Sequence, residues 1–416
     1  MEFSRADFSR LLAEPGVSTI LRLINQGGYE ARIVGGAVRN VLMGLPSKDI
    51  DIATTATPQQ VMALAARMQI RALPVGLAHG TVTLVVGGQN FEITTLRQDV
   101  VTDGRHAKVK FSQDFAVDAA RRDFTVNALS LSLDGTLHDY VGGLADIKAR
   151  HIRFIGNPAQ RIAEDRLRVL RFFRFYAVYG QGAIDAAGLK AAIAARQQLS
   201  QLSPERLQAE MGRLLDAADP VPTLQIMADT DILPCIIGGM AYPNRVRNLL
   251  RAVPTADRTQ RLAALAVTVA EDADRLRDRL RLSNAVYKRL HAAAGILSGW
   301  HGRALPPSQH ELMAAMLVHS RPATLDGLAL VLAQAPREAA QAFGDTIRLL
   351  RDAKPPKLPL SGMDVLKSQP MAGARVGQIL KALQARWIRA GFPNGPAALS
   401  ALLEEAIASV EKDAGQ

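Results

Sequence analysis

The stretch LPSKDIDIATTATP, residues 45–58, places two aspartates, Asp49 and Asp51, one residue apart and beside two isoleucines. Side chains alternate between the faces of a β-strand, so the isoleucines would point into a core and the aspartates would project together from the other face. Two carboxylates this close repel each other unless a cation, a shared proton or open water compensates. The stretch therefore predicts either a cation site or an exposed strand end that leads into a Ser/Thr/Pro-rich turn.

The segment before the aspartates favours the cation site. RIVGGAVRNVLMG, residues 32–44, has the pattern of a strand, a Gly-Gly turn that ends at Gly36, and a helix that carries Arg39 one turn in. Paired glycines let backbone N–H groups approach an anion, and a helix N-terminus adds favourable partial charge, so this turn can hold phosphate. Mg²⁺ binds through one or two carboxylates plus substrate phosphates. We therefore expect Asp49 and Asp51 to bind Mg²⁺ in a two-metal site that polarises an attacking hydroxyl, stabilises the pentacovalent phosphate and carries the leaving pyrophosphate.

Two later segments each leave two interpretations open. NFEITTLR, residues 90–97, alternates like a strand and sets Glu92 opposite its apolar neighbours, so Glu92 is either a third acidic group at the site or an exposed strand residue. RQDVVTDGRHAKVKF, residues 97–111, is polar, contains glycine and carries Arg105. It is either a loop that closes over a substrate or a long, solvated hairpin connection.

The segment DAARRDFTVNALSL, residues 118–131, sets Arg122 and Asp123 against an apolar run. Paired arginines suit the oxygens of a triphosphate, and an aspartate suits a ribose hydroxyl. A structural ion pair between arginine and aspartate is the alternative.

The strongest helical pattern is EDRLRVLRFFRF, residues 164–175. Its arginines recur every third residue and share one face, with an aspartate three residues before the first of them. An Asp–Arg pair can read a base edge, because the carboxylate accepts from the exocyclic amine of cytosine or adenine and the guanidinium donates to the neighbouring ring acceptor. The residues concerned are Asp165, Arg168, Arg171 and Arg174. The alternative is a basic, solvated helix face.

The whole chain has the composition of a globular protein with a basic excess. Its 416 residues predict two to four domains, and the net charge of +11 is compatible with a polyanionic partner. Its one cysteine, Cys235, cannot form an internal disulfide, and the N-terminal segment is too charged for a signal peptide. No apolar run reaches membrane-spanning length, so we expect a cytoplasmic protein without a membrane part.

Strand-like runs are confined to about the first 150 residues, and the rest is rich in Ala, Leu and Arg at helical spacing. This pattern predicts an α/β head on a long helical remainder without repeats. Proline marks breaks in the remainder at residues 201–207, 252–258, 303–309 and 352–362, and the last is the best linker candidate.

Nine segments, taken in order, resemble the class II tRNA nucleotidyltransferase and poly(A) polymerase family of the DNA polymerase β superfamily. They are GGAVRN, LPSKDIDIATTATP, GLAHGTVTL, FEITTLR, TDGRHAKVKF, RRDFTVNALS, DYVGGLADI, AEDRLRVLRFFRF and SPERLQAEMGRLL. The resemblance implies an α+β fold, with a polymerase β-like nucleotidyltransferase head of mixed sheet and helices followed by an all-helical neck, body and tail. The expected bounds are 1–150 for the head, 151–216 for the neck, 217–352 for the body and 353–416 for the tail.

The resemblance also implies roles for the residues already singled out. Asp49 and Asp51 would hold the catalytic Mg²⁺, and the triphosphate would contact Gly36, Arg39 and Arg122. Asp165 and Arg168 would select the incoming base, and Arg171 and Arg174 would complete the nucleotide pocket. One departure is visible, because the family more often has proline at the position of Arg166, which bears on where the helix starts.

The expected activity is addition of CCA to the tRNA 3′ end from CTP and ATP. Body and tail would bind tRNA, and the basic stretches at 244–262 and 274–290 fit either phosphate contact or a solvated face. Poly(A) polymerase and A-only addition are the alternatives; GLAHGTVTL lacks the basic segment of bacterial poly(A) polymerases, and the DGRH loop indicates that A is added. A non-catalytic tRNA-binding protein would lack a metal aspartate or the base-reading pair, which are all present. No protein partner can be inferred.

Overall fold

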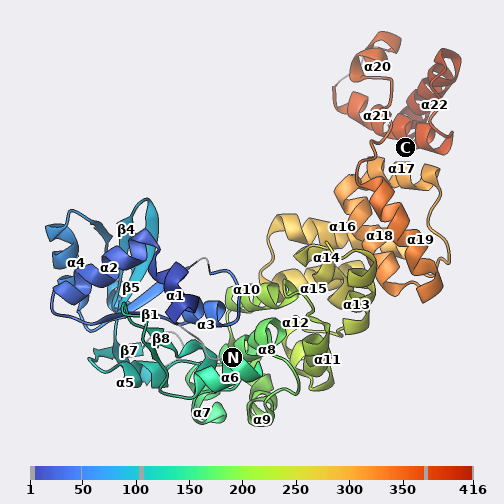
Figure 1. Ribbon diagram of the computed structural model, residues 1–416. Helices are drawn as coiled ribbons and strands as arrows, with labels where there is room; N and C mark the ends of the chain where they lie inside the picture. Colours follow the sequence, from blue (N-terminus) through green and yellow to red (C-terminus); the bar gives the residue numbers. More distant parts are fainter. Residues whose placement is uncertain (1–4, 48, 103–106, 370–372, 415–416) are drawn as a thin grey trace. The chain divides into compact units, whose positions relative to one another are not determined.

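The structure, a computed structural model, describes residues 5–47, 49–102, 107–369 and 373–414. The chain forms two compact units, Met1–Ala241 with Arg279–Arg281, and Tyr242–Asp278 with Leu282–Gln416. The strands of the described residues end at His138, and helices follow them (Figure 1). The expected α+β class, with a mixed sheet first and helices after it, is therefore confirmed.

The first unit contains both the strands and the first helices. In chain order they are α1 (Arg5–Leu12), α2 (Pro15–Gln26), β1 (Ala31–Val34), α3 (Gly36–Leu42), β2 (Asp51–Thr54), α4 (Pro58–Arg67), β3 (Arg71–Leu73), η1 (Leu77–His79), β4 (Thr81–Val86), β5 (Gln89–Thr95), β6 (Arg97–Thr102), β7 (Ala107–Phe111), α5 (Phe115–Ala120), η2 (Thr125–Asn127), β8 (Ser130–Leu131), β9 (Leu137–His138), α6 (Gly143–Ala149), α7 (Pro158–Glu164), α8 (Arg168–Tyr179), α9 (Ala186–Ala195), η3 (Arg196–Gln201), α10 (Pro204–Leu215), α11 (Val221–Asp229) and α12 (Ile232–Ile237).

A seven-stranded sheet in the order β3-β4-β5-β2-β1-β8-β9 forms the centre of the head. β2 pairs in parallel with β5 and antiparallel with β1, so the sheet is mixed. The register sets Asp51, the first residue of β2, between Val34 of β1 and Glu92 of β5. Paired residues on neighbouring strands share a face, so Glu92 lies beside Asp51.

Helices α2 and α4 cover the opposite face of this sheet (Figure 1). Gly16 of α2 lies so close to Phe91 that a Cβ at position 16 would come within 2.4 Å of the ring. Ile52 and Ile93 alternate onto the same face and are fully buried. Asp51 therefore lies on the face opposite buried Ile52, as the sequence pattern predicted. Ile50, also expected in the core, is only half-buried, because it and Asp49 precede the strand.

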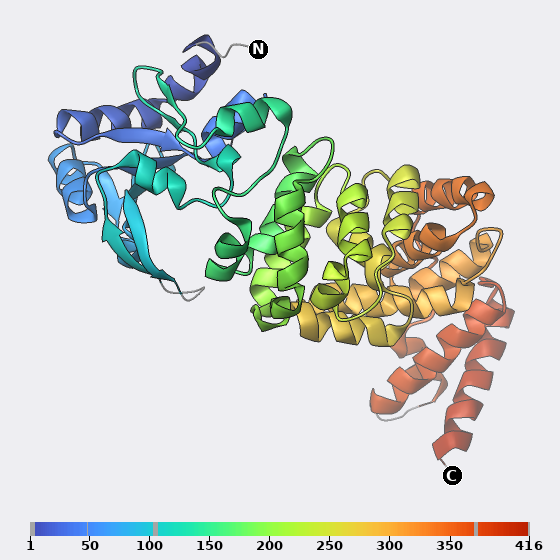
Figure 2. The same ribbon diagram turned by 90° about the horizontal axis from the view of Figure 1, so that it is seen from below.

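The segment 97–111, expected as a loop, forms a two-stranded ribbon of β6 and β7, which Figure 2 shows in teal. The strands shift register between Asp99 and Val101, as at a β-bulge. The ribbon was missed because the polar composition of the segment conceals two short strand signals, the β-branched run VVT and the alternating run AKVKF. Arg105 lies outside the described residues.

The helix expected over residues 164–175 is in fact two helices. α7 ends at Glu164, Asp165 has an extended backbone with φ −151° and ψ 109°, and α8 begins at Arg168. The Asp165 carboxylate accepts a hydrogen bond from the backbone N–H of Leu167 at 3.1 Å. This local bond competes with the helical ladder, so the chain turns between the two helices.

Aromatic packing fixes α8 against the head. The ring of Phe124, just before η2, lies 4.9 Å from the ring of Phe154 and 5.0 Å from that of Phe175 on α8. Phe124 and Phe172 are fully buried, with ring centroids 6.3 Å apart. Burial of this much aromatic surface dominates the local energetics, so η2 and α8 form one rigid support for side chains between them.

The second unit is helical throughout its described residues. It contains α13 (Pro243–Ala252), α14 (Arg258–Ala266), α15 (Ala270–Leu280), α16 (Asn284–Trp300), α17 (Gln309–His319), α18 (Arg321–Gln334), α19 (Arg337–Leu350), α20 (Gly362–Ser368), α21 (Gly373–Arg389) and α22 (Pro396–Ala414), except that residues 279 and 280 at the end of α15 belong to the first unit.

Close packing of α16 against α18 forms the centre of this unit. A Cβ at Gly327 of α18 would lie 2.4 Å from the side chain of Ile296, so only glycine permits this approach. Buried Asp326 accepts hydrogen bonds from Arg289 of α16 at 2.6 and 2.8 Å. At the C-terminal end α21 and α22 lie side by side, in red in Figure 2, with Leu383 and Leu403 in their shared core.

The four expected breaks all fall between helices: η3 and α10, α13 and α14, α16 and α17, and α19 and α20. The boundary between the compact units lies at residues 241–242, and the finer division into neck, body and tail stays a prediction. In the part of the chain that the structure describes, no helix is both long and apolar enough to cross a membrane.

Candidate active site

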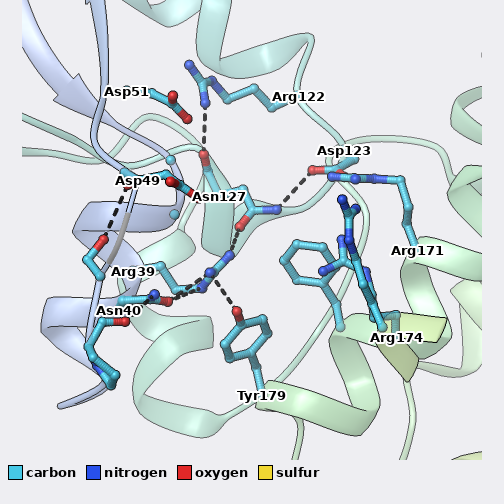
Figure 3. A pocket seen from close by; sticks show the side chains of 16 residues that line it. Arg39, Asn40, Asp49, Asp51, Arg122, Asp123, Asn127, Arg171, Arg174 and Tyr179 are labelled. Atoms are coloured by element: carbon cyan, nitrogen blue, oxygen red, sulfur yellow. Dashed lines mark hydrogen bonds and ion pairs between the residues drawn. The ribbon is translucent and has the colours of Figure 1, made fainter. Parts of the chain in front are cut away.

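A cavity of about 660 Å³ lies in the first unit, where the β1–α3 turn, the loop before β2, η2, α8 and α10 meet. This volume is typical of a site for a small molecule. Its lining consists of Gly35, Gly36, Arg39, Asn40, Pro46, Ser47, Asp49, Asp51, Arg122, Asp123, Asn127, Arg171, Arg174, Phe175, Tyr179 and Arg213. Eight of the predicted residues therefore line one cavity, although they come from four separate segments of the sequence (Figure 3).

The two aspartates of the opening stretch lie at one side of the cavity (Figure 3). Partial burial raises the pKa of the Asp51 carboxyl, and the charges of Glu92 and Asp49 raise it further, while Arg122 opposes them. Glu92 does not line the cavity but is the register partner of Asp51. The negative charges of Glu92 and Asp49 thus act on the Asp51 carboxylate, and a cation would relieve this repulsion.

The Gly-Gly turn fits closely under one of the predicted phosphate ligands. Gly35 has φ 70° and ψ −126°, a conformation that L side chains rarely adopt. A Cβ at Gly35 would also lie 3.1 Å from Nη1 of Arg122. Position 35 therefore needs glycine both for its backbone and for the space that the guanidinium occupies.

Arg39 of α3 is buried and has a hydrogen-bond partner at each of its guanidinium nitrogens. Nε and Nη2 donate to Oδ1 of Asn40 at 3.1 and 2.8 Å, Nη1 donates to Oδ1 of Asn127 at 2.5 Å, and Nη2 also donates to the Tyr179 hydroxyl at 2.8 Å. The guanidinium lies 4.0 Å above the Tyr179 ring. Burial lowers the pKa of Arg39 from its ordinary value, although an arginine stays protonated. These contacts fix its orientation at the cavity wall.

Arg122 is held by the helix that precedes it. Its Nε and Nη2 donate to Oδ2 of buried Asp118 at 3.3 and 3.1 Å, and its Nη1 donates to the backbone carbonyl of Asn127 at 3.3 Å. Burial alone would raise the pKa of Asp118, but Arg122 and Arg121 hold it below the ordinary value. The partner of Arg122 is therefore Asp118 rather than the adjacent Asp123.

Asp123 pairs with α8. Its Oδ2 accepts from Nε and Nη2 of Arg171 at 2.8 and 2.6 Å. Burial alone would raise the pKa of Asp123, but the charge of Arg171 and hydrogen bonds from Asn127 and Arg171 hold it below the ordinary value. The structural ion pair considered from the sequence is present, but its partner is 48 residues away.

A buried carboxylate, Glu210 of α10, gathers arginines behind the cavity. Its oxygens accept from Arg174 at 2.6 Å and from Arg213 at 3.1 Å, and Arg171 lies 3.8 Å away. Burial lowers the pKa of Arg174. Asp123 already pairs with Arg171, so Glu210 balances only one of Arg174 and Arg213, and one positive charge remains at this wall of the cavity, which suits a polyphosphate.

Asp165 and Arg168, the residues expected to read the base, do not line the cavity. Asp165 accepts a hydrogen bond from Arg206 at 2.7 Å. Arg168 pairs with Glu164 and donates to the backbone carbonyl of Arg161 at 3.0 Å. The structure thus gives each member a separate partner, because the turn between α7 and α8 separates them.

Sequence reasoning missed five polar residues, Asn40, Asn127, Tyr179, Glu210 and Arg213. Asn127 lies four residues after Asp123 in a segment already singled out, and Tyr179 lies eight residues after Arg171, which places both on the same side of α8. Glu210 is an acidic residue on the apolar side of an amphipathic helix, a pattern that indicates a buried ion pair. The sequence spacing could have indicated these positions, but it could not have indicated which residues they bond, because those contacts depend on the tertiary structure.

The cavity residues fit a hard divalent cation. Among the described residues no group of three or more His, Cys, Asp or Glu side chains could hold a metal ion by itself. Two carboxylates, Asp49 and Asp51, that share a cavity with the Gly-Gly turn and arginines nevertheless fit Mg²⁺, which binds through one or two carboxylates together with substrate phosphates.

Two segments of this chain match known protein families. Residues 31–153 match the family described as "Poly A polymerase head domain", and residues 183–241 match "Probable RNA and SrmB- binding site of polymerase A". The mitochondrial CCA tRNA nucleotidyltransferase 1 of Mus musculus is 32% identical over 404 residues, which cover 94% of this chain and 90% of that protein. The chain belongs to the family of class II CCA-adding tRNA nucleotidyltransferases.

Two further relatives agree with this membership. The CCA-adding enzyme of Oceanobacillus iheyensis is 38% identical over 226 residues, which cover 53% of this chain and 55% of that protein. The crystal structure of the Bacillus stearothermophilus CCA-adding enzyme in complex with CTP superposes with a TM-score of 0.73 at 26% identity, covering 98% of this chain and 99% of that one. The chain is therefore a nucleotidyltransferase, an enzyme class whose members with this head are typically metal-dependent.

Proposed function

We propose that this enzyme adds C, C and A in turn to the 3′ end of tRNA from CTP and ATP, and releases pyrophosphate at each step. The observation that carries the proposal is the cavity, which sets Asp49 and Asp51 opposite five arginines in a chain similar to CCA-adding enzymes over nearly its whole length. Carboxylates for a metal and cations for a polyphosphate are the two groups that nucleotidyl transfer requires.

The triphosphate binds between the Gly-Gly turn and the arginines. The backbone N–H of Gly36 and the guanidinium of Arg122 face the phosphates, and Arg174 and Arg213 balance the remaining charge. Arg39 lines the same wall, but its nitrogens are engaged by Asn40, Asn127 and Tyr179. It therefore supports the phosphate site mainly through its charge and its neighbours.

Asp49 and Asp51 hold Mg²⁺ in this proposal, with Glu92 beside Asp51 as a further carboxylate. When bound, the metal ions lower the pKa of the attacking 3′ hydroxyl and stabilise the charge on the leaving pyrophosphate. The chain holds the two carboxylates at fixed positions, Asp51 at the start of a sheet strand and Asp49 two residues earlier. Because these carboxylates repel each other, the site favours a cation over an empty state.

Base selection is proposed for Asp165 and Arg168. Both are held in place, Asp165 by Arg206 and Arg168 by Glu164, and they adjoin Arg171 along the same stretch of chain. A fixed carboxylate and a fixed guanidinium are what recognition of an amine beside a ring acceptor needs. Asp123, held by Arg171, is proposed to lie near the ribose.

Transfer RNA is the proposed macromolecular partner, bound by the helical part of the chain. The expected location in the cytoplasm stays a prediction, since the relative from Mus musculus is mitochondrial by name.

The test is Asp51→Asn, which removes one metal-binding charge while keeping the size of the side chain. We expect nucleotide addition in Mg²⁺ to fall at least about a thousandfold, because the metal supplies several kcal/mol of transition-state stabilisation. The dissociation constant for tRNA, measured by filter retention or fluorescence anisotropy, should stay within about twofold of the wild-type value. Asp51 is not one of the basic residues that attract the RNA phosphates. Addition at the wild-type rate would contradict the metal assignment.

A further inference from the structure

The amide of Asn127 connects the two groups of arginines in the cavity. Its Oδ1 accepts from Arg39 of α3 at 2.5 Å, and its Nδ2 donates to Oδ1 of Asp123 at 3.1 Å (Figure 3). Asp123 in turn accepts from Arg171 of α8 through its other oxygen. One side chain thus joins the phosphate side of the cavity to the arginines of α8.

Only an amide satisfies both neighbours. A guanidinium offers donors alone, and an ionised carboxylate offers acceptors alone. The carbonyl of Asn127 therefore faces Arg39 and its amino group faces Asp123, and the reversed orientation would oppose donor to donor and acceptor to acceptor. Asn127 is only 8% exposed, so either mismatch would leave buried polar groups unpaired.

The network closes on α8 at both ends. Arg39 donates to the hydroxyl of Tyr179 at the C-terminal end of α8, and Arg171 lies near its N-terminal end. The backbone carbonyl of Asn127 also accepts from Arg122 at 3.3 Å. Loss of the amide would release Arg39 and Asp123 from each other, and with Asp123 the orientation of Arg171.

We infer that Asn127 is a positioning residue that fixes the cations of the nucleotide pocket relative to the metal-binding aspartates. Its effect is on alignment and not on nucleotide capture, because every arginine remains when the amide is removed. The fold does not depend on it, because the rings of Phe124 and Phe175, 5.0 Å apart, hold η2 against α8 independently. This inference rests on the proposed function of the cavity.

The test compares N127L, which removes both hydrogen bonds, with N127D, which keeps the acceptor toward Arg39 and opposes Asp123 with a second carboxylate. The control is N157D, at the N-cap of α7, where Asn157 accepts from the backbone N–H groups of Ala159 and Gln160 and aspartate caps equally well. The kcat and the KM for CTP are measured on tRNA that ends before CCA, with the active fraction determined from the burst of a single turnover.

We expect N127L and N127D to lower kcat per active site by about ten- to hundredfold, the effect of a small misplacement of reacting groups. KM for CTP should stay within about threefold, and N157D should match the wild type. The double variant D123N/N127D restores a donor beside an acceptor, so it should recover at least about threefold in kcat over N127D.

The inference would be overturned if N127L had the wild-type kcat, or if its loss of activity were fully explained by the fraction of unfolded protein. It would also be overturned if the kcat of D123N/N127D were no higher than that of N127D. The wild-type reaction is measured first and separately. Absence of CTP incorporation by the wild type would overturn the proposed function and the inference with it, whereas normal wild-type addition with an unaffected N127L overturns the inference alone.

Discussion

The ionised carboxylate of Asp51 lowers the stability of the folded protein when no metal is bound. Partial burial, with Glu92 and Asp49 nearby, raises the pKa of this carboxyl above its ordinary value in the folded state. The folded protein therefore binds the proton more tightly than the unfolded chain, so the stabilising contribution of this group is fully present below the ordinary pKa and is lost as pH rises through the raised pKa. Such strain at a site is expected where a ligand supplies the missing charge.

This sign leads to a prediction for Asp51→Asn in the absence of divalent cations. The variant has no charge to accommodate, so it should unfold at a higher urea concentration than the wild type at about pH 7, and the difference should shrink toward about pH 4. Urea unfolding in EDTA at both pH values measures it. A variant less stable than the wild type at neutral pH would show that the carboxylates are not under repulsion.

Gly35→Ala tests the turn under Arg122. Alanine at position 35 must keep a backbone conformation that is rare for L residues, so the free energy of unfolding should fall by about 1–3 kcal/mol. Its Cβ would also press against the guanidinium of Arg122, so KM for CTP should rise. Gly44→Ala is the matched control, since Gly44 has the same φ of 70° but no described atom within 4 Å of its added Cβ. The free energy of unfolding should fall for both variants, whereas KM for CTP should rise only for Gly35→Ala. Equal KM values for the two variants would contradict the fit of Arg122.

Helix α10 supports the cavity through its buried carboxylate. Glu210 is 3% exposed and contacts Arg171, Arg174 and Arg213. Glu210→Gln leaves several guanidiniums around a neutral group, and loss of one partner of a buried ion pair costs about 3–5 kcal/mol. Glu205→Gln on the same helix is the control, because its pair with Arg281 is largely exposed and worth under about 1 kcal/mol. Denaturant unfolding measures the free energy of unfolding of both variants. Equal values for E210Q and E205Q would contradict a supporting role for Glu210 of α10.

At the scale of elements, the sequence predicted most of what lies in the site and less of how it is connected. The strand with Asp51, the Gly-Gly turn and the arginines of α8 could be predicted because each depends on local pattern. The turn at Asp165 was missed because its carboxylate bonds the Leu167 N–H in competition with the helix, and the pattern of arginines does not record that competition. The pairing of Asp123 with Arg171 was also out of reach, because it depends on tertiary packing.

At the scale of the whole molecule, the basic stretches of the second unit divide into structural and surface arginines and lysines. Arg289 is bound to buried Asp326, and Arg245 donates to Thr268 and stacks on Tyr242. Arg251 and Lys288, by contrast, are exposed. The sequence left phosphate contact and a solvated face open for these charges. The structure shows that Arg289 and Arg245 have structural partners instead, and phosphate contact by the exposed Arg251 and Lys288 stays a prediction.

Charge reversal at Arg251 and Lys288 should therefore weaken tRNA binding. Removal of one phosphate-binding cation reduces the slope of log K against log salt by about 1, so the double reversal should flatten the slope by about 2. Arg337→Glu, an exposed residue of α19 outside both stretches, is the control for charge reversal at a single site. Titrations at several salt concentrations measure the slopes, and equal slopes for control and double variant would place the tRNA elsewhere.

The most direct test of CCA addition by this enzyme is nucleotide incorporation in Mg²⁺ on three tRNA transcripts that end before CCA, after C and after CC. Each transcript is supplied with CTP, ATP or both, and products are resolved at single-nucleotide length. We predict three, two and one additions with both nucleotides, and no extension beyond the final A. An unbounded adenosine ladder, which would indicate a poly(A) polymerase, or addition of A to the third transcript alone would contradict the proposed function.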